Sequence, residues 1–531
     1  MTTTDQAPHP GTWAPLAIGA FRALWIAQLV SNVGTWMQTV GAQWLLVTSP
    51  NAAALTAMAQ AASLLPVLFV SLPAGVLADI FDRRRYLIAT QLAAIAVVGL
   101  LAVLTALGLA TPSVVLLLTF GLGVTTALAS PAWQAIQPQL VPRELIPGAA
   151  ALGSMNINLA RAIGPAVAGV IIAASSPAVV FGINAASTVF VVVALLRWHP
   201  APGPDREPER IVPALRSGSR YVANAPVVRR ILLRSALFVI PASALWALLA
   251  VVASDRLGLG SGGYGLLLGA LGAGAVIGAL LLTRIRRLLG PNRLLGAFTL
   301  LYAVGMVATA VVGSAPLLMV LLLASGVGWL VMLSTFNTNL QLTLAGWVRA
   351  RGMSTYLLVF LGGQGVGALV WGAVAQWIGV SPALLVATGL LIVGAGTLLV
   401  WRLPSASLDR TISAPWPDPE VDVAPDPVDG PVVVEVTYCV EERVEEFLAA
   451  ARALGLSRRR TGATSWVLYR DVADHTVYVE VFSVPTWSEH LRQHYERMTG
   501  YDSELERRVE AFDARGPEGS STTRHLVAIR T

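Results

Sequence analysis

Arg161 is the one permanent charge in an apolar run that spans residues 149–173. An isolated arginine at the centre of a bilayer costs at least about 2.5–3.5 kcal/mol, so its side chain should face other helices or water. Ser154 and Asn158 share its helical face, and Pro165 cannot donate to the carbonyl of Arg161. Two hypotheses stay open. Arg161 attracts or senses an anionic or acceptor-rich substrate in a central cavity, or it bonds to carbonyls of a neighbouring helix.

Uncharged polar residues recur at spacings of three and four along three other apolar segments, which places them on one face of each helix. The stripes are Gln28, Asn32, Thr35 and Thr39; Thr126, Ser130, Trp133 and Gln137; and Ser334, Asn337 and Gln341. They favour a polar-lined cavity with aromatic walls that include Trp25, Trp36, Trp44, Trp133, Trp246 and Trp329. The eight residues that we expect to line it are Gln28, Asn32, Thr35, Ser130, Gln137, Asn158, Asn337 and Gln341. The alternative is hydrogen bonding between helices, worth roughly 0.6 kcal/mol per bond.

His490 and His494 stand four residues apart near the C-terminus. That spacing can bind zinc, but no glutamate follows His490 as in the H-E-x-x-H motif. We therefore expect an exposed pair, or a pair at the edge of a core. No set of nucleophile, base and orienting group is evident, and the single cysteine, Cys439, excludes an internal disulfide and a cysteine-built metal site. We expect no catalytic residues, no metal and no cofactor.

The elements that carry these residues are too apolar for a water-soluble protein. Of the 531 residues, 55% are hydrophobic and only 12% are charged, against roughly 25% charged in soluble domains. Charges are sparse up to about residue 400 and dense after 430, which indicates a membrane domain followed by a soluble one. The excess of arginine fits loops at a membrane surface. We expect the lipid bilayer as a partner and no nucleic acid, and residues 1–20 show no signal-peptide pattern.

A helix needs about 20 apolar residues to cross the hydrocarbon core, and twelve segments qualify. They are 21–47, 54–78, 87–109, 112–137, 148–173, 178–198, 229–253, 263–283, 292–312, 316–341, 352–376 and 381–401. The connections after even-numbered spans carry 17 arginines, whereas those after odd-numbered spans carry only Arg256. The positive-inside rule then predicts a multi-pass protein of the cytoplasmic membrane with both termini in the cytoplasm.

An internal repeat divides the spans into six plus six. Gly278, Arg286 and Arg287 follow Gly75, Arg83 and Arg84 by 203 residues, and Gln341 follows Gln137 by 204. Two matches at nearly one offset indicate a duplicated six-helix unit. The expected domains are a first half, an inter-half loop, a second half, a linker rich in proline and aspartate, and a soluble domain, at 1–198, 199–228, 229–402, 403–430 and 431–531.

The segment "GVLADIFDRRR", residues 75–85, resembles the loop signature G-x-L-A-D-R-x-G-R-R of the major facilitator superfamily, and the resemblance covers residues 15–405. Ile80 and Asp82 depart from it, and Asp82 is similar to the variant of the enterobactin-exporter and macrolide-efflux branch. The resemblance implies a gating loop formed by Gly75, Asp79, Arg83 and Arg84. Gly75 would permit close helix approach. The alternative for the arginines is a topology anchor at the membrane surface.

Residues 151–169 resemble the antiporter motif of the fifth helix, with alanine at three glycine positions, and the matching residues are Ala151, Ala160, Gly164, Pro165, Ala168 and Gly169. In the family this motif accompanies export. The resemblance also implies that helices 1, 4, 7 and 10 line the central cavity, where the polar stripes then fall. It implies proton counter-transport, although no acidic residue lies within the twelve spans.

The C-terminal residues predict a β–α–β–β–α–β domain, with strands at 432–440, 465–471, 476–484 and 524–530 and helices at 441–454 and 487–498. The pattern is ferredoxin-like and resembles the dimeric α/β-barrel domain of antibiotic-biosynthesis-type monooxygenases. We expect a regulatory or dimerising module and a homodimer through this domain.

The fold class we expect is an all-α polytopic membrane protein of twelve helices in two halves, plus a small α+β domain. The function we expect is a secondary transporter, not an enzyme, that exports a small organic molecule, drug-like or siderophore-like, by proton-coupled alternating access. An uptake permease, or a transporter fused to an active monooxygenase-like enzyme, is the alternative.

Overall fold

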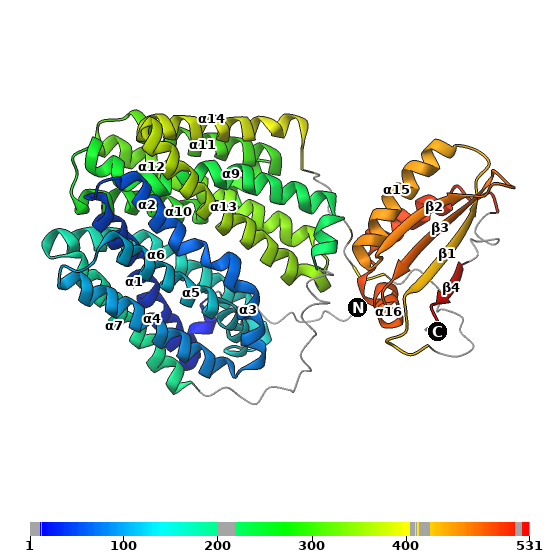
Figure 1. Ribbon diagram of the computed structural model, residues 1–531, viewed down its shortest axis with the longest axis horizontal. Coiled ribbons are helices and arrows are strands. Elements are labelled where there is room, and N and C mark those ends of the chain that lie inside the picture. The colour runs from blue at the N-terminus through cyan, green and yellow to red at the C-terminus, as the bar shows by residue number, and fades with distance from the viewer. Residues whose placement is uncertain are drawn as a thin grey trace, which may run out of the picture. The chain divides into compact units, whose positions relative to one another are not determined.

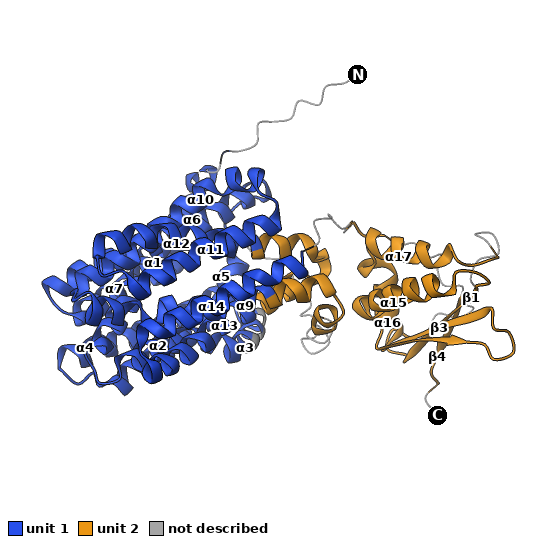
Figure 2. Ribbon diagram, turned by 90° about the horizontal axis from the view of Figure 1, so that it is seen from above, with its two compact units in different colours: residues 1–208, 234–335, 357–402 blue, residues 209–233, 336–356, 403–531 orange. Residues whose placement is uncertain are grey.

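The computed structural model describes residues 11, 13–198, 218–403, 409, 411–413, 425–515 and 523–529. Most of the expected inter-half loop and linker therefore lies outside the described residues. The chain forms two compact units (Figure 2). The first holds residues 1–208, 234–335 and 357–402, and the second holds residues 209–233, 336–356 and 403–531.

Long helices run through both sequence halves (Figure 1). In the first half they are α1 Gly19–Val47, α2 Ala52–Leu64, α3 Pro66–Ile80, α4 Arg83–Ala106, α5 Pro112–Ile136, α6 Ile146–Ala174 and α7 Pro177–Arg197. In the second half they are α9 Pro226–Val251, α10 Ser261–Leu288, α11 Pro291–Val311, α12 Ala315–Thr343, α13 Arg349–Ile378 and α14 Val380–Val400. The expected second span is divided into α2 and α3 because Pro66 cannot continue the hydrogen-bond ladder of α2.

Eleven helices among the described residues are long and apolar enough to cross a membrane. We expected twelve such spans. The helix that falls short is α1, which has 29 residues but carries the polar stripe that begins at Gln28. Polar side chains lower the mean hydropathy of a span without shortening it, so α1 still has the length to cross. The expected fold class, a polytopic helical membrane domain followed by a small α+β domain, is confirmed.

The C-terminal domain is a four-stranded antiparallel sheet with helices on one face. Its elements are β1 Val432–Cys439, α15 Val444–Thr461, β2 Ser465–Arg470, β3 Val477–Val484, α16 Trp487–Arg492, α17 Gly500–Glu510 and β4 Thr523–Val527. The strand order is β2-β3-β1-β4. The expected β–α–β–β–α–β order is present, but the second helical segment continues beyond residue 498 as a separate helix, α17. We did not expect α17, whose start is capped because Asp502 accepts from the backbone and the hydroxyl of Thr499 at 3.1 and 2.6 Å.

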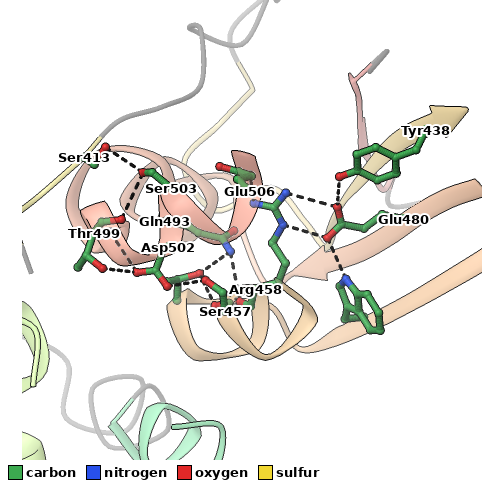
Figure 3. A network of polar contacts seen from close by, with 12 residues as sticks. Ser413, Tyr438, Ser457, Arg458, Glu480, Gln493, Thr499, Asp502, Ser503 and Glu506 are labelled. Carbon is green, nitrogen blue, oxygen red and sulfur yellow. Dashed lines mark hydrogen bonds and ion pairs between the residues drawn. The ribbon is translucent and has the colours of Figure 1, made fainter. Parts of the chain in front are cut away.

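Buried ion pairs join the helices of this domain to its sheet (Figure 3). Arg458 Nε lies 3.0 Å from Glu480 Oε1, and Arg458 also pairs with Glu506. Tyr438 and Trp466 each donate to Glu480 at 2.8 Å. Arg458 lies in the last turn of α15, and these contacts hold that turn against the sheet. The helix extends to Thr461, seven residues beyond the end we expected.

Candidate functional site

A cavity of about 400 Å³ lies among α1, α4, α5, α6 and α7 of the first half. Among the described residues, every polar residue in its lining is uncharged: Gln28, Ser31, Asn32, Thr35, Gln91, Thr125, Thr126, Ser130, Gln134, Gln137, Asn156, Asn184 and Thr188. Trp25 and Trp133 add aromatic walls. A polar, aromatic-walled space inside a helix bundle can bind a small organic molecule through hydrogen bonds and ring contacts.

The structure brings together five of the eight cavity residues that the sequence suggested. Gln28, Asn32, Thr35, Ser130 and Gln137 all line this cavity.

The other three do not line it. Asn158 donates to the carbonyl of Ser154, one turn earlier on its own helix, at 2.9 Å. Asn337 and Gln341 bond to each other on α12 at 2.6 Å, and both belong to the second compact unit.

Several lining residues were missed by the sequence analysis. Asn184 and Thr188 are spaced by four residues on α7, and this helical spacing of polar residues could have predicted a polar face there. Asn156 gave no such signal, because it stands alone on the face of α6 opposite to Asn158. The structure shows that Asn156 is 2% exposed and bridges two helices, since it accepts from Asn32 at 2.9 Å and donates to the carbonyl of Trp25 at 2.8 Å.

Arg161 does not line the cavity, and its guanidinium group lies over the ring of Trp36, 5.3 Å from the centroid. Its Nε and Nη1 atoms are buried and have no hydrogen-bond partner among the described residues. The alternative in which neighbouring carbonyls satisfy the guanidinium group therefore does not hold for these two atoms. A cation stacked on tryptophan keeps its N–H groups available for an acceptor.

Glycines let α6 of the first half meet α10 of the second half at backbone contact. A Cβ atom on Gly169 would lie 2.7 Å from the carbonyl of Ser261, and one on Gly265 would lie 2.5 Å from that of Pro165. Gly164 faces its own half, where a Cβ would lie 2.6 Å from Cβ of Trp36. The predicted motif thus supplies the close packing that joins the two halves.

The halves also meet at the end of the bundle away from the arginine-rich connections. Tyr264 donates to Gln43 across them, and Gln376 donates to Asn51 at 2.6 Å.

The expected gating loop lies between α3 and α4. Arg84 donates to the carbonyls of Leu195 and Leu196 at 2.8 and 2.6 Å, so it caps the end of α7. A Cβ on Gly75 would meet nothing within 4 Å, so the close helix approach expected there is wrong. Asp79 stands in the last turn of α3, and its side chain lies outside the described part of the structure. Arg83 is the first residue of α4.

The C-terminal domain contacts two connecting segments within the second unit. The guanidinium group of Arg497 lies 5.0 Å from the ring centroid of Trp347, and the indole of Trp347 donates to the carbonyl of Arg497 at 3.3 Å. Arg220 donates to the carbonyl of Gly462 at 3.2 Å, and Tyr221 packs edge-on against Trp347. Trp347 lies between α12 and α13, and Arg220 precedes α9, so the domain touches two connections of the membrane helices.

His490 and His494 are 0% and 1% exposed, so the exposed pair that we considered is wrong, and a buried pair at the edge of the core remains. The rings of His490 and His525 lie 4.9 Å apart. Burial is the main cause that lowers the pKa of His490 to about 3. His490 is therefore neutral at physiological pH. Within the described ranges, no group of three or more His, Cys, Asp or Glu side chains is arranged to hold a metal ion.

A family model described as "Transmembrane secretion effector" matches residues 10–531, which include the C-terminal domain. A staphyloferrin A transporter of Staphylococcus aureus is 32% identical over 168 residues, which cover 32% of this chain and 42% of that protein. The enterobactin exporter EntS of Escherichia coli is 30% identical over 395 residues, which cover 72% of this chain and 91% of the exporter.

Solved transporters share the fold of the membrane domain. The POT family transporter PepTSo has a TM-score of 0.61 at 12% identity and matches 72% of this chain and 97% of its own. A bacterial homologue of the human lysosomal transporter Spinster, in an inward-facing conformation, has a TM-score of 0.57 at 14% identity and matches 72% of this chain and 94% of its own. At such identities the likeness establishes the fold alone.

Proposed function

This chain belongs to the transmembrane secretion effector family of major facilitator transporters, and we propose that the small molecule it exports is siderophore-like. The protein is a secondary transporter and not an enzyme. The observation that carries the proposal is the uncharged cavity of about 400 Å³, and the resemblance to an enterobactin exporter over 91% of that exporter's length supports the substrate class. We further propose that the protein lies in the cytoplasmic membrane with both termini in the cytoplasm, as the arginine-rich connections suggest.

Flux measurements test export against uptake. Inside-out vesicles that contain the protein should accumulate enterobactin, whereas right-side-out vesicles should not. Vesicles without the protein are the control. Accumulation only in right-side-out vesicles would favour the uptake permease, and no flux of enterobactin in either orientation would reject the siderophore-like substrate.

Proton counter-transport is the coupling that we propose. The twelve spans expected from the sequence carry no acidic residue, and Glu144 and Asp255 stand near the ends of the observed spans, so the proton carrier would lie at a helix end or on the substrate itself. Collapse of the pH gradient with nigericin should stop accumulation of enterobactin in inside-out vesicles. Accumulation that persists without a proton gradient contradicts the coupling.

Asp79 is proposed to gate the transition between states, because it occupies the aspartate position of the family's loop signature. Asp79→Asn should reduce export while membrane insertion and protein level stay near normal. Cysteine labelling of the cytoplasmic ends should increase. Unchanged flux together with unchanged labelling would leave Asp79 as a topology residue.

Arg161 is proposed to bind an acceptor group of the exported molecule. Two of its buried N–H-bearing atoms have no hydrogen-bond partner in the described chain, and a substrate carboxylate or phenolate could accept from them.

The C-terminal domain is proposed to regulate transport through its contacts with Trp347 and Arg220. These contacts use the end of α15 and the segment after α16, and none of the described residues covers the other face of the sheet. That face is largely apolar, and its residues include Val467, Tyr469 and Leu526, which are 43%, 55% and 42% exposed. We propose that a second copy of the same sheet covers it and forms a homodimer. A monomer of the full-length protein in detergent, by sedimentation well above micromolar concentration, would contradict the dimer.

A further inference from the structure

A chain of side-chain amides crosses the cavity wall from α1 to α6. Gln28 Nε2 donates to Asn32 Oδ1 at 3.2 Å, and Asn32 Nδ2 donates to Asn156 Oδ1 at 2.9 Å. Asn156 Nδ2 then donates to the backbone carbonyl of Trp25 at 2.8 Å. All four residues line the cavity.

The backbone carbonyl at the end of this chain determines the direction of every bond in it. A carbonyl oxygen can only accept, so Asn156 must turn its NH₂ group towards Trp25 and its oxygen towards Asn32. Asn32 must then donate to Asn156, and Gln28 must donate to Asn32. The backbone carbonyl of Trp25 thus fixes which side of each amide is the oxygen and which is the nitrogen.

Within this series of hydrogen-bonded amides, the side-chain carbonyl oxygen of Gln28 has no partner. Gln28 Oε1 is buried and accepts no hydrogen bond among the described residues. A buried acceptor without a donor is costly, and such atoms in native structures call for an explanation. The last torsion of a glutamine side chain is broad, so this oxygen can adjust towards a ligand that fills the cavity.

Three threonine hydroxyl groups of the lining add acceptors rather than donors. Thr35 donates to the carbonyl of Ser31 at 3.0 Å, and Thr125 and Thr126 donate to the carbonyl of Leu122 at 2.8 and 2.9 Å. Each hydroxyl hydrogen is therefore used within its own helix, and only the oxygen lone pairs remain for a ligand.

We infer that the cavity recognises its cargo through hydrogen-bond donors, with a neutral hydroxyl or N–H group bound to Gln28 Oε1 and an aromatic or other apolar body against Trp25 and Trp133. The inference rests on the proposed function, since it names the chemistry of the exported molecule at the proposed cavity. It complements Arg161, which offers donors away from this cavity.

Two probes with the same ring and the same pair of oxygens, of which only one donates hydrogen bonds, test it on the full-length protein in nanodiscs. Catechol and 1,2-dimethoxybenzene share a ring and two oxygens, but only catechol donates. Binding measured by calorimetry at millimolar concentrations should favour catechol by about two- to tenfold, as expected for one neutral hydrogen bond. In Gln28→Met, which lacks the acceptor, the preference should fall to about one. Gln341→Met, which removes an amide of α12 that does not line this cavity, should retain it.

Equal binding of the two probes to the parent protein, no binding of catechol, or a preference that survives Gln28→Met would each overturn the inference. The comparison on the parent protein needs no variant, so it remains decisive if Gln28→Met does not fold. None of these outcomes depends on export. Failure of the parent protein to transport enterobactin would instead reject the proposed substrate class, and the two failures are therefore distinguishable.

Discussion

At the scale of single residues, Arg161 is a buried cation whose hydrogen-bonding capacity the described residues satisfy only in part. Its guanidinium group stacks on Trp36, yet Nε and Nη1 find no acceptor in the described residues. If the exported molecule supplies that acceptor, Arg161→Ala should lower the export rate about 10- to 100-fold, the worth of one charge-assisted hydrogen bond. Arg161→Lys keeps the charge without the planar fork and should be partly active.

Ser154→Ala is the matched control for Arg161, because the hydroxyl of Ser154 only returns to the carbonyl of Ala150 on the same helix. Flux of enterobactin from proteoliposomes at equal protein density measures the effect. If the flux of Arg161→Ala equals that of the parent protein, Arg161 does not bind the exported molecule. If the variant fails to accumulate in the membrane, the role of Arg161 is structural.

At the scale of elements, the contact between α6 and α10 depends on glycines, which have no side chain and so let the two backbones touch. A Cβ on Gly272 would lie 2.6 Å from the carbonyl of Arg161, and backbone cannot move aside as a flexible side chain can. Gly272→Ala should destabilise the bundle by about 1–3 kcal/mol through overpacking. Gly262→Ala on the same helix should be neutral, because its Cβ would meet no atom closer than 3.9 Å. Thermal unfolding in detergent compares the two, and equal midpoints would refute the packing argument.

The C-terminal domain depends in the same way on the buried partners of one carboxylate (Figure 3). Glu480 is 1% exposed and receives Arg458, Tyr438 and Trp466. Glu480→Leu leaves the buried Arg458 with fewer partners and should cost about 3–5 kcal/mol of domain stability. Amide hydrogen exchange in β1 and β3 of the full-length protein should accelerate accordingly. Glu435→Leu, on the other face of the sheet and 30% exposed, is the control, and equal exchange in both variants would count against the role of the buried pair.

At the scale of the whole molecule, the contacts of the C-terminal domain with Trp347 and Arg220 tie it to the segments between the membrane helices. Contacts that exist in one state of a transport cycle stabilise that state and slow the exit from it. Loss of the cation–π contact in Trp347→Ala should therefore raise the export rate about two- to fivefold. Arg497→Ala should raise the export rate in the same way. Arg507→Ala removes a charged side chain of α17 that is 70% exposed, and it should leave the export rate unchanged. Unchanged export in both docking variants would exclude regulation through this contact.

The sequence by itself determined the membrane helices and the β–α–β–β–α–β order, because both follow from local properties. A span needs about 20 apolar residues in a row, and a strand alternates its side chains between two faces, so each can be recognised within one segment. Even so, α17 was missed, because its charged sequence carries no apolar run and its start depends on the Thr499–Asp502 cap.

Only the tertiary structure decided which polar residues act together. The hydrogen bond between Asn32 and Asn156 joins residues 124 positions apart, the stacking of Arg161 on Trp36 joins α6 to α1, and Gly272 meets Arg161 across the two halves. Helical periodicity assigns a residue to a face but cannot tell which helix that face will meet. The partners of Asn156, Arg161 and Gly272 exist only once the bundle has packed, and it is packing that separates the five residues lining the cavity from the three that the same periodicity suggested.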